Sequence, residues 1–288
     1  MSESTRASQV WPAEAETFVD SLVSIVCPAW NASSHIEFAM QSVIRQTYDS
    51  WELIVVDDGS SDDTAQIVER FSKIDGRISL LRNASNKGVA DARSLGISQA
   101  RGRWLAFLDS DDEWLPTKLA ETIEFARKMD SPLTYTGYST MSHSGRVDGS
   151  SIRVPARVSR KELLTSNVIV NSSAIIDRAS FDPVGILPVL KSSDDFARWL
   201  EILKFHPFAY GLQRDLVRYR LTTKSLSRNK FRALRKVWRV YRLSAQIGIL
   251  SSLLLIPIYI LRALPKFIRV NIVLLRKGWT GTRDSGPA

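Results

Sequence analysis

Short apolar runs alternate with amphipathic stretches through the first half of the chain. Residues 104–108 contain five apolar side chains without a polar interruption, which predicts a strand buried on both faces. Residues 34–46 instead place apolar side chains at helical spacing. The repeated strand-helix order favours a parallel sheet with right-handed crossovers. We expect strands at 22–27, 52–56, 78–81 and 104–108, and helices at about 34–46, 64–73 and 89–100.

Beyond residue 112 the pattern becomes a mixture. A capping-box spacing predicts a short helix that begins at Ser159, with Glu162 three residues later. An amphipathic helix is expected to begin at Asp194 and Asp195. The other expected elements are a helix at 116–129, strands at 133–138, 168–176 and 216–220, and a polar loop or hairpin at 142–153.

The length and the pattern together predict one large α/β domain with an appendage. The expected divisions are a loosely ordered leader at 1–20, a domain at 21–227 that changes character near 115–116, and a basic and apolar helical segment at 228–288. The first 20 residues are polar and lack the apolar core of a signal peptide, and Cys27 is the single cysteine. Both features fit a cytoplasmic protein without disulfides.

The charge of the chain is unevenly distributed. The net charge is +9, but residues 216–283 contain 16 Lys or Arg and no Asp or Glu, so the remainder carries −7. A basic segment on an acidic body predicts an anionic partner, either a membrane surface or a nucleic acid. The segment interleaves its charges with an apolar run at 243–261, which suits lipid better than a phosphate backbone. We therefore expect a membrane partner and no nucleic acid.

The same apolar run is a weak transmembrane segment. Its 19 uncharged residues match the thickness of a bilayer, but serines, Gln246 and Pro257 dilute its apolar character. Cations on both sides give no preferred orientation. We favour helices that lie in the cytoplasmic leaflet over a spanning helix. The alternative is a helical pair packed against the domain or a second subunit.

Carboxylates follow two of the expected strands. Asp58 comes after the strand at 52–56, and Asp109 and Asp111, separated by Ser110, come after the strand at 104–108. Ligands of open α/β sheets bind where strands end at their carboxyl tips. Asp109 and Asp111 can direct hard oxygens at one divalent cation, which in turn can hold a diphosphate. Either cluster alone also fits an ordinary turn, but two clusters at two strand ends favour a binding site.

Polar and basic side chains extend this expected site. Asp58 can accept a hydrogen bond from a base or a ribose, and Lys87 and Arg93 add positive charge near the same rim. A solvated surface position explains Lys87 equally well.

Several segments together resemble the family 2 glycosyltransferases of the GT-A fold. The match follows the family's order and spacing over about residues 21–225. The matching segments are VSIVCPAWN at 23–31, SVIRQTY at 42–48, WELIVVDDGSSD at 51–62, NKG at 86–88 with AR at 92–93, and FLDSDD at 107–112. The resemblance implies a Rossmann-like, mostly parallel sheet flanked by helices. It also implies a nucleotide-sugar donor, usually linked through uridine diphosphate (UDP), and transfer with inversion.

Positions that match the family's motifs give the implied donor side. The second aspartate of the metal motif, Asp111, is the more dependable ligand, and oxygen-only ligands favour Mg²⁺ or Mn²⁺. A Thr or Ser followed by Tyr is commoner than Ala29-Trp30, so the stacking surface beside the base differs here. The expected donor-binding residues are Pro28, Ala29, Trp30, Asp58, Lys87, Arg93, Asp109, Ser110 and Asp111, with Asp109 and Asp111 on the metal.

The resemblance also implies the general base. Family members carry an acidic residue or Gln, then Asp, before an aromatic residue and a Trp-Leu pair, so Asp195 matches the base and Asp194 its neighbour. Residue chemistry alone would make Asp195 a helix cap. The other residues expected on the acceptor or diphosphate side are Trp114, Arg218 and Arg220, although alternating charge on an edge strand explains the arginines equally well.

These implications predict a peripheral enzyme on the cytoplasmic face of the membrane, with a lipid-linked or polysaccharide acceptor. A sugar nucleotidyltransferase is the first alternative, but it normally has a Gly-rich basic loop after its first strand, and residues 28–31 are not one. A non-catalytic sugar-nucleotide-binding protein is the second alternative. The intact set of Asp58, Asp109, Asp111 and Asp195 argues against it.

Overall fold

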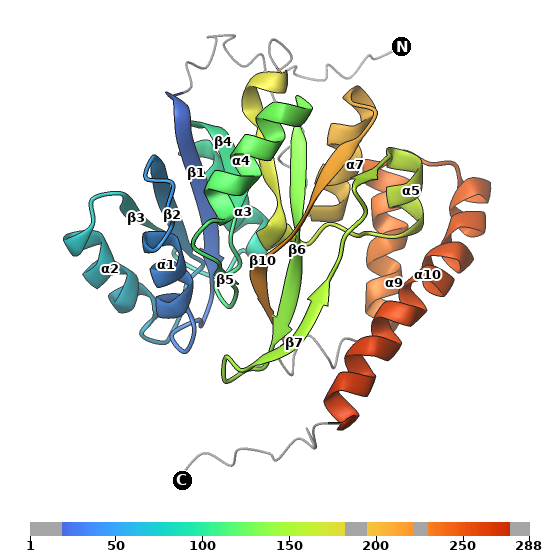
Figure 1. Cartoon of the computed structure of the whole chain (residues 1–288). Helices are drawn as coiled ribbons and strands as arrows, with labels where there is room; N and C mark the ends of the chain where they lie inside the picture. Colours follow the sequence, from blue (N-terminus) through green and yellow to red (C-terminus); the bar gives the residue numbers. More distant parts are fainter. Residues whose placement is uncertain (1–18, 182–194, 222–229, 277–288) are drawn as a thin grey trace, which may run out of the picture.

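A single mixed sheet with helices on both faces forms the body of the molecule in the computed structural model (Figure 1). The structure describes residues 19–181, 195–221 and 230–276. The sheet has ten strands in the order β3-β2-β1-β4-β9-β6-β10-β5, with β7 beside β6 and β8 beside β10. The strands are β1 (Val19–Ala29), β2 (Trp51–Asp57), β3 (Ile78–Arg82), β4 (Gly102–Phe107), β5 (Glu113–Trp114), β6 (Leu133–Met141), β7 (Val147–Ile152), β8 (Arg157–Val158), β9 (Ile175–Asp177) and β10 (Ala209–Arg220).

The first four strands form the predicted parallel core. β1 lies between β2 and β4, and Val26 pairs with Ile54 on one side and Phe107 on the other. Every residue of β2 and the last seven residues of β1 are buried. This burial explains why these strands are continuous apolar runs, since helices cover both faces of a parallel sheet.

The second half of the sheet is mixed, so the sheet as a whole is mostly parallel. β10 runs parallel to β6, whereas β9 runs antiparallel to both β4 and β6. β7 turns back on β6, so the expected polar hairpin at 142–153 is confirmed. The strand predicted at 168–176 is wrong. Its centre is the 3₁₀ turn η1 (Asn171–Ser173), and only β9 remains extended.

Local hydrogen bonds explain that difference. The Ser173 hydroxyl donates to the Val170 carbonyl oxygen, and the Ala174 amide donates to the Asn171 carbonyl oxygen. Asn and Ser side chains offer such local alternatives to a strand ladder. The turn therefore interrupts a sequence whose Val and Ile residues favour a strand.

The helices predicted at 34–46, 89–100 and 116–129 form with one or both ends shorter, and the helix predicted at 64–73 extends to Ile74. The capping box of α5 is formed, because the Ser159 side chain accepts from the Glu162 amide and the Ser159 amide donates to the Glu162 carboxylate. The helices are α1 (Ile36–Ile44), α2 (Thr64–Ile74), α3 (Val89–Ser98), α4 (Lys118–Met129), α5 (Arg160–Thr165), α7 (Asp195–Phe205), α9 (Lys230–Arg239) and α10 (Ile249–Arg276), with a 3₁₀ turn η2 (Arg178–Phe181) and a π-helical turn η3 (Val240–Ser244).

The carboxyl-terminal helices pack against the rest of the chain and leave an apolar face outward. Arg262 Nη1 donates to Thr165 Oγ1 of α5 at 2.6 Å, and α10 extends along one side of the molecule (Figure 1). Leu250, Leu254 and Leu261 of α10 are 66–77% exposed. No helix in the described part of the chain combines the length and the apolar character needed to cross a membrane.

Candidate active site

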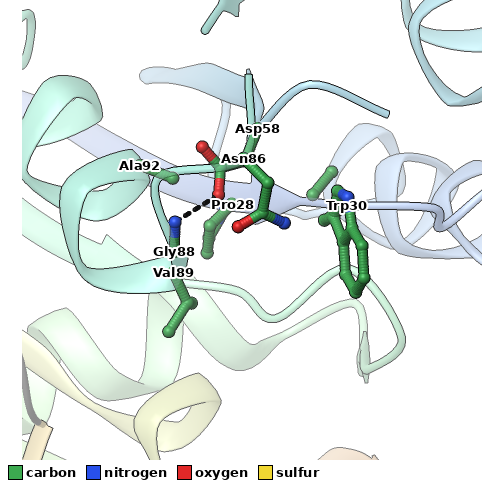
Figure 2. A pocket seen from close by; sticks show the side chains of 8 residues that line it. Pro28, Trp30, Asp58, Asn86, Gly88, Val89 and Ala92 are labelled. Carbon is green, nitrogen blue, oxygen red and sulfur yellow. Dashed lines mark hydrogen bonds between the residues drawn. The ribbon is translucent and has the colours of Figure 1, made fainter. Parts of the chain in front are cut away.

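A pocket of about 350 Å³ opens at the carboxyl ends of β1 and β2 (Figure 2). Trp30 lies at one side of it, and Val89 and Ala92 at the start of α3 lie at the other. The volume falls in the range of small-molecule sites. The lining residues are Pro28, Ala29, Trp30, Asp58, Asn86, Gly88, Val89 and Ala92, so four predicted donor-binding residues meet here.

Asp58 fixes the loop that forms one wall of this pocket. Its Oδ1 accepts from Asn83 Nδ2 at 2.7 Å and from the Lys87 amide at 3.0 Å, and its Oδ2 accepts from the Gly88 amide at 2.7 Å. Burial alone would raise the pKa of Asp58, but these hydrogen bonds outweigh it and hold the pKa below its ordinary value. Asp58 therefore remains ionised and anchors residues 83–88.

Gly59 allows this loop to approach closely. It has φ +70°, and a Cβ atom there would lie 2.7 Å from the Ser85 carbonyl carbon. A residue with a side chain would clash and would also be strained in this left-handed conformation. The glycine thus keeps the ends of β2 and β3 in contact at the pocket.

Asp109 is held by two donors on one oxygen. Its Oδ1 accepts from Arg93 Nη2 at 2.6 Å and from Asn171 Nδ2 at 3.1 Å. Arg93 is buried and neutralises this carboxylate from inside the fold. Lys87, in contrast, is exposed on the loop beside the pocket.

Asp111 accepts the fewest hydrogen bonds of the three aspartates in residues 109–112. Within the described ranges no other residue donates to its oxygens or to Asp109 Oδ2. Burial, followed by the charge of Asp109, raises the pKa of Asp111 to about 6. Two carboxylates that repel each other in this way are stabilised by a bound cation.

The carboxylate oxygens of Asp109 and Asp111 suit a divalent cation that takes its remaining ligands from a substrate. The described residues contain no group of three or more His, Cys, Asp or Glu side chains that could hold a metal ion. Mg²⁺ is usually bound by one or two carboxylates together with substrate phosphates. Asp109 and Asp111 supply two carboxylates. Among the described residues, Asp109 Oδ2 accepts no hydrogen bond, and the Asp111 carboxylate accepts only from its own amide.

Asp112 and Arg220 tie this segment to the second half of the sheet. Asp112 Oδ1 accepts from the Arg220 amide at 2.9 Å. The Arg220 guanidinium donates to the Asp111 carbonyl oxygen, the Ser142 and His143 carbonyl oxygens and the Glu113 carboxylate. Burial, then the charges of Asp111 and Asp109, raises the pKa of Asp112 well above its usual range.

Three of the residues predicted on the acceptor side, Trp114, Arg218 and Arg220, have internal partners. Arg218 pairs with Asp215 at 2.8 Å, and Arg220 is 3% exposed within its clamp. Trp114 is buried, its Nε1 donates to the Ser172 carbonyl oxygen at 2.8 Å, and Lys118 Nζ lies 3.8 Å from its ring centre. In this structure Trp114, Arg218 and Arg220 hold β5 and the end of β10 in place. Asp194 lies outside the described residues.

Asp195 is the first residue of α7, and topology directs that end of the helix toward the site. Three residues join α7 to β10, which runs parallel to β6, so the carboxyl end of α7 lies at the amino edge of these strands. The amino end of α7 consequently points toward their carboxyl edge. Trp199, one turn after Asp195, packs on Phe107 at the end of β4 with ring centres 6.1 Å apart. Asp195 Oδ1 also accepts from the Phe196 amide at 2.9 Å.

A contact between two histidines joins the halves of the molecule near the same edge. His35 Nε2 and His143 Nδ1 are 3.2 Å apart, and their rings meet edge to face. His35 precedes α1, and His143 lies in the turn between β6 and β7. Burial, followed by the charges of Arg220 and His143, lowers the pKa of His35 to about 4.

The sequence prediction included Asn86 only as part of the NKG motif at 86–88 and did not identify Asn83, Asn171 or Ser172 as site residues. Asn83 and Asn86 stand in the loop after β3, where asparagines after a strand are a usable signal. Asn171 and Ser172 fall in the segment predicted as a strand, so its pattern hid them. The contact of Asn83 with Asp58, and those of Asn171 and Ser172 with Asp109, come from tertiary structure alone.

Comparison with known proteins identifies the family. Residues 24–182 match the model of glycosyl transferase family 2. The putative teichuronic acid biosynthesis glycosyltransferase TuaG of Bacillus subtilis is 38% identical over 77% of this chain and 87% of its own length. The Escherichia coli UDP-Glc:alpha-D-GlcNAc-diphosphoundecaprenol beta-1,3-glucosyltransferase WfgD is 37% identical over 77% of this chain and 85% of its own length.

Solved structures show the same fold at low identity. TarS of S. aureus in complex with UDP has a TM-score of 0.60 at 16% identity, covering 84% of this chain and 71% of TarS. Mannosyltransferase PcManGT from Pyrobaculum calidifontis in complex with GDP-Man and Mn²⁺ has a TM-score of 0.61 at 16% identity, covering 93% of this chain and 77% of that protein. The fold is thus the α/β GT-A fold, and the chain belongs to glycosyl transferase family 2.

Proposed function

We propose that this glycosyltransferase moves a sugar from a UDP-linked donor to a lipid-linked or polysaccharide acceptor, with inversion at the sugar carbon. The observation that carries the proposal is the pocket at the ends of β1 and β2, with Asp109 and Asp111 at the end of the adjacent β4. UDP-glucose and a diphosphoundecaprenol acceptor appear in the name of WfgD, and UDP is bound to TarS, which supports this choice of substrates.

The donor binds with its base in the pocket and its diphosphate toward the aspartates. Trp30 is half exposed and offers its indole as a stacking surface, and the loop held by Asp58 forms the opposite wall. Lys87 adds positive charge at the rim. Arg93 acts indirectly, because it fixes the orientation of Asp109.

Asp109 and Asp111 would hold a Mn²⁺ or Mg²⁺ ion that binds together with the donor. When bound, the ion supplies positive charge that stabilises the leaving diphosphate. Ser110 spaces the two carboxylates, and the clamp of Arg220 on the Asp111 carbonyl oxygen fixes the turn.

Asp195 is the general base of the reaction. The acceptor hydroxyl forms a bond to the anomeric carbon as the bond from that carbon to the diphosphate oxygen breaks, and Asp195 takes the hydroxyl proton. A positioned base contributes roughly 10²–10⁴ in rate. Single displacement inverts the carbon, so no covalent sugar intermediate is needed. Asp194 is proposed as its neighbour on the acceptor side.

The acceptor proposal includes peripheral binding to the cytoplasmic face of an anionic membrane. The exposed apolar side chains of α10 stand in a segment that carries 16 cations and no carboxylate between residues 216 and 283. Such a helix binds in the interfacial plane through its apolar face and its charges. A lipid-linked acceptor would be presented at that plane.

A donor screen tests the proposal. The full chain is incubated with UDP-glucose, UDP-N-acetylglucosamine and GDP-mannose, with Mn²⁺ or EDTA, and with or without extracted membrane lipid. We expect release of UDP from one UDP-sugar that needs both Mn²⁺ and lipid. Binding of the nucleotide sugars without any transfer would favour a non-catalytic binding protein, and no binding of any of them would overturn the proposal.

A further inference from the structure

The turn η1 contacts the aspartate segment, residues 109–112, through the Ser172 side chain. The Ser172 hydroxyl accepts from the Asp109 amide at 3.1 Å and donates to Asp112 Oδ2 at 2.5 Å. The Ser172 carbonyl oxygen accepts from Trp114 Nε1. One fully buried serine therefore determines where the backbone of Asp109 and the side chain of Asp112 lie.

Asn171 contacts the same segment through its side-chain amide. Its Nδ2 donates to Asp109 Oδ1, the oxygen that also accepts from Arg93 Nη2. Two donors on Oδ1 leave the other oxygen, Oδ2, without a hydrogen bond among the described residues.

The surroundings of Asn171 argue against a role in packing alone. The residue is 3% exposed, and its Oδ1 has no hydrogen-bond partner among the described residues. A buried acceptor without a donor lowers stability, and an apolar side chain of similar size would avoid that loss. Unsatisfied buried groups of this kind are expected at functional sites.

We propose that Asn171 and Ser172 are positioning residues for the cation site, which they create by fixing Asp109 Oδ1 and Asp112. The cation is then held by Asp109 Oδ2 and the carboxylate of Asp111. This inference rests on the proposed function, because it assumes that a divalent cation binds with UDP. Neither residue touches the reacting atoms.

Ser173 provides a matched control within the same turn. It is fully buried like Ser172, but its hydroxyl donates to the Val170 carbonyl oxygen and makes no hydrogen bond to an aspartate among the described residues. Ser172→Ala and Ser173→Ala therefore remove the same atom from adjacent buried positions. Only the first change removes a contact with the aspartate segment.

Binding of Mn²⁺ to the full chain in the presence of UDP gives a readout that does not depend on turnover. Electron paramagnetic resonance measures free Mn²⁺ for the wild type, Asn171→Ala, Ser172→Ala and Ser173→Ala. Changes to residues that orient metal ligands typically cost about 10–100-fold in metal affinity. We expect that loss for Asn171→Ala and Ser172→Ala, a Ser173→Ala affinity close to wild type, and unchanged binding of UDP without Mn²⁺ in all three variants.

The outcomes separate this inference from the proposed function. Wild-type Mn²⁺ affinity in both Asn171→Ala and Ser172→Ala would overturn the positioning role. An equal loss in Ser173→Ala would also overturn it, because the fold of the turn would then be responsible. If the wild type itself binds no Mn²⁺ with UDP, the proposed cation site fails, and the inference fails with it.

Discussion

Asp58 holds the loop that forms one wall of the pocket. Its three donors all belong to the loop at 83–88, which lines the pocket. Asp58→Asn places an amide group against backbone N–H donors and leaves at least one of them unpaired. We expect a loss of about 1–3 kcal/mol in the free energy of unfolding and weaker UDP binding. Urea unfolding and calorimetry measure the two effects.

Asp63 is the control for that change. It precedes α2, is exposed and makes no side-chain capping bond, so Asp63→Asn should leave both quantities at wild-type values. Unchanged UDP affinity in Asp58→Asn would contradict the role given to the loop.

His35 makes stability depend on pH. Its folded-state pKa of about 4 lies below the ordinary 6.5, so the unfolded chain binds more protons between these values. The His35 contribution to stability is therefore present above about pH 6.5 and is lost as the pH falls toward 4. His35→Gln should reduce the loss of stability between about pH 7 and 5, measured by urea unfolding. An identical pH dependence in the variant and the wild type would show that His35 is not held neutral.

The acidic residues of the site were predictable from sequence, but their partners were not. Asp58, Asp109 and Asp111 stand directly after apolar strands, and that position identifies them. The contacts of Asp109 with Arg93 and Asn171 join residues separated by 16 and 62 positions. Such pairings depend on how strands are ordered in the sheet, which a local pattern does not contain.

At the scale of elements, continuous apolar runs identified the parallel strands well. The run at 168–176 failed, because local Asn and Ser hydrogen bonds outweighed the strand preference of its Val and Ile residues. The capping box of α5 succeeded because it is a contact between residues three apart. Local signals thus gave most of the element types, and the interruption at η1 came from local hydrogen bonds that the apolar pattern does not show.

Changes to the outward face of helix α10 test the membrane proposal. Leu250 and Leu254 lie one turn apart and are 77% and 68% exposed. Burying one Leu is worth about 1.5–3 kcal/mol, so we expect the double change to Ser to weaken binding to anionic vesicles at least about tenfold. Cosedimentation measures this binding.

Ile74 on α2 provides the control for that measurement. It is 86% exposed and lies far along the chain from the basic segment, so Ile74→Ser should bind vesicles like the wild type. Equal vesicle binding by the α10 double variant and the wild type would contradict the proposed surface.

At the scale of the whole molecule, the sheet brings distant segments to one edge. The strands β1, β2 and β4 deliver Trp30, Asp58 and Asp109, and Arg220 at the end of β10 clamps the segment that follows β4. The short connection to β10 directs the start of α7 toward the same edge. One half of the sheet thus supplies the proposed donor pocket, and the other half supplies the proposed base.

The most direct test of this account is the reaction of Asp195→Asn. Acceptor-dependent release of UDP from the preferred UDP-sugar is measured with Mn²⁺ and extracted lipid, and UDP affinity is measured in parallel. We predict that the rate falls by roughly 10²–10⁴ while UDP affinity stays within about twofold of the wild type. Transfer at the wild-type rate by Asp195→Asn would contradict the proposed mechanism.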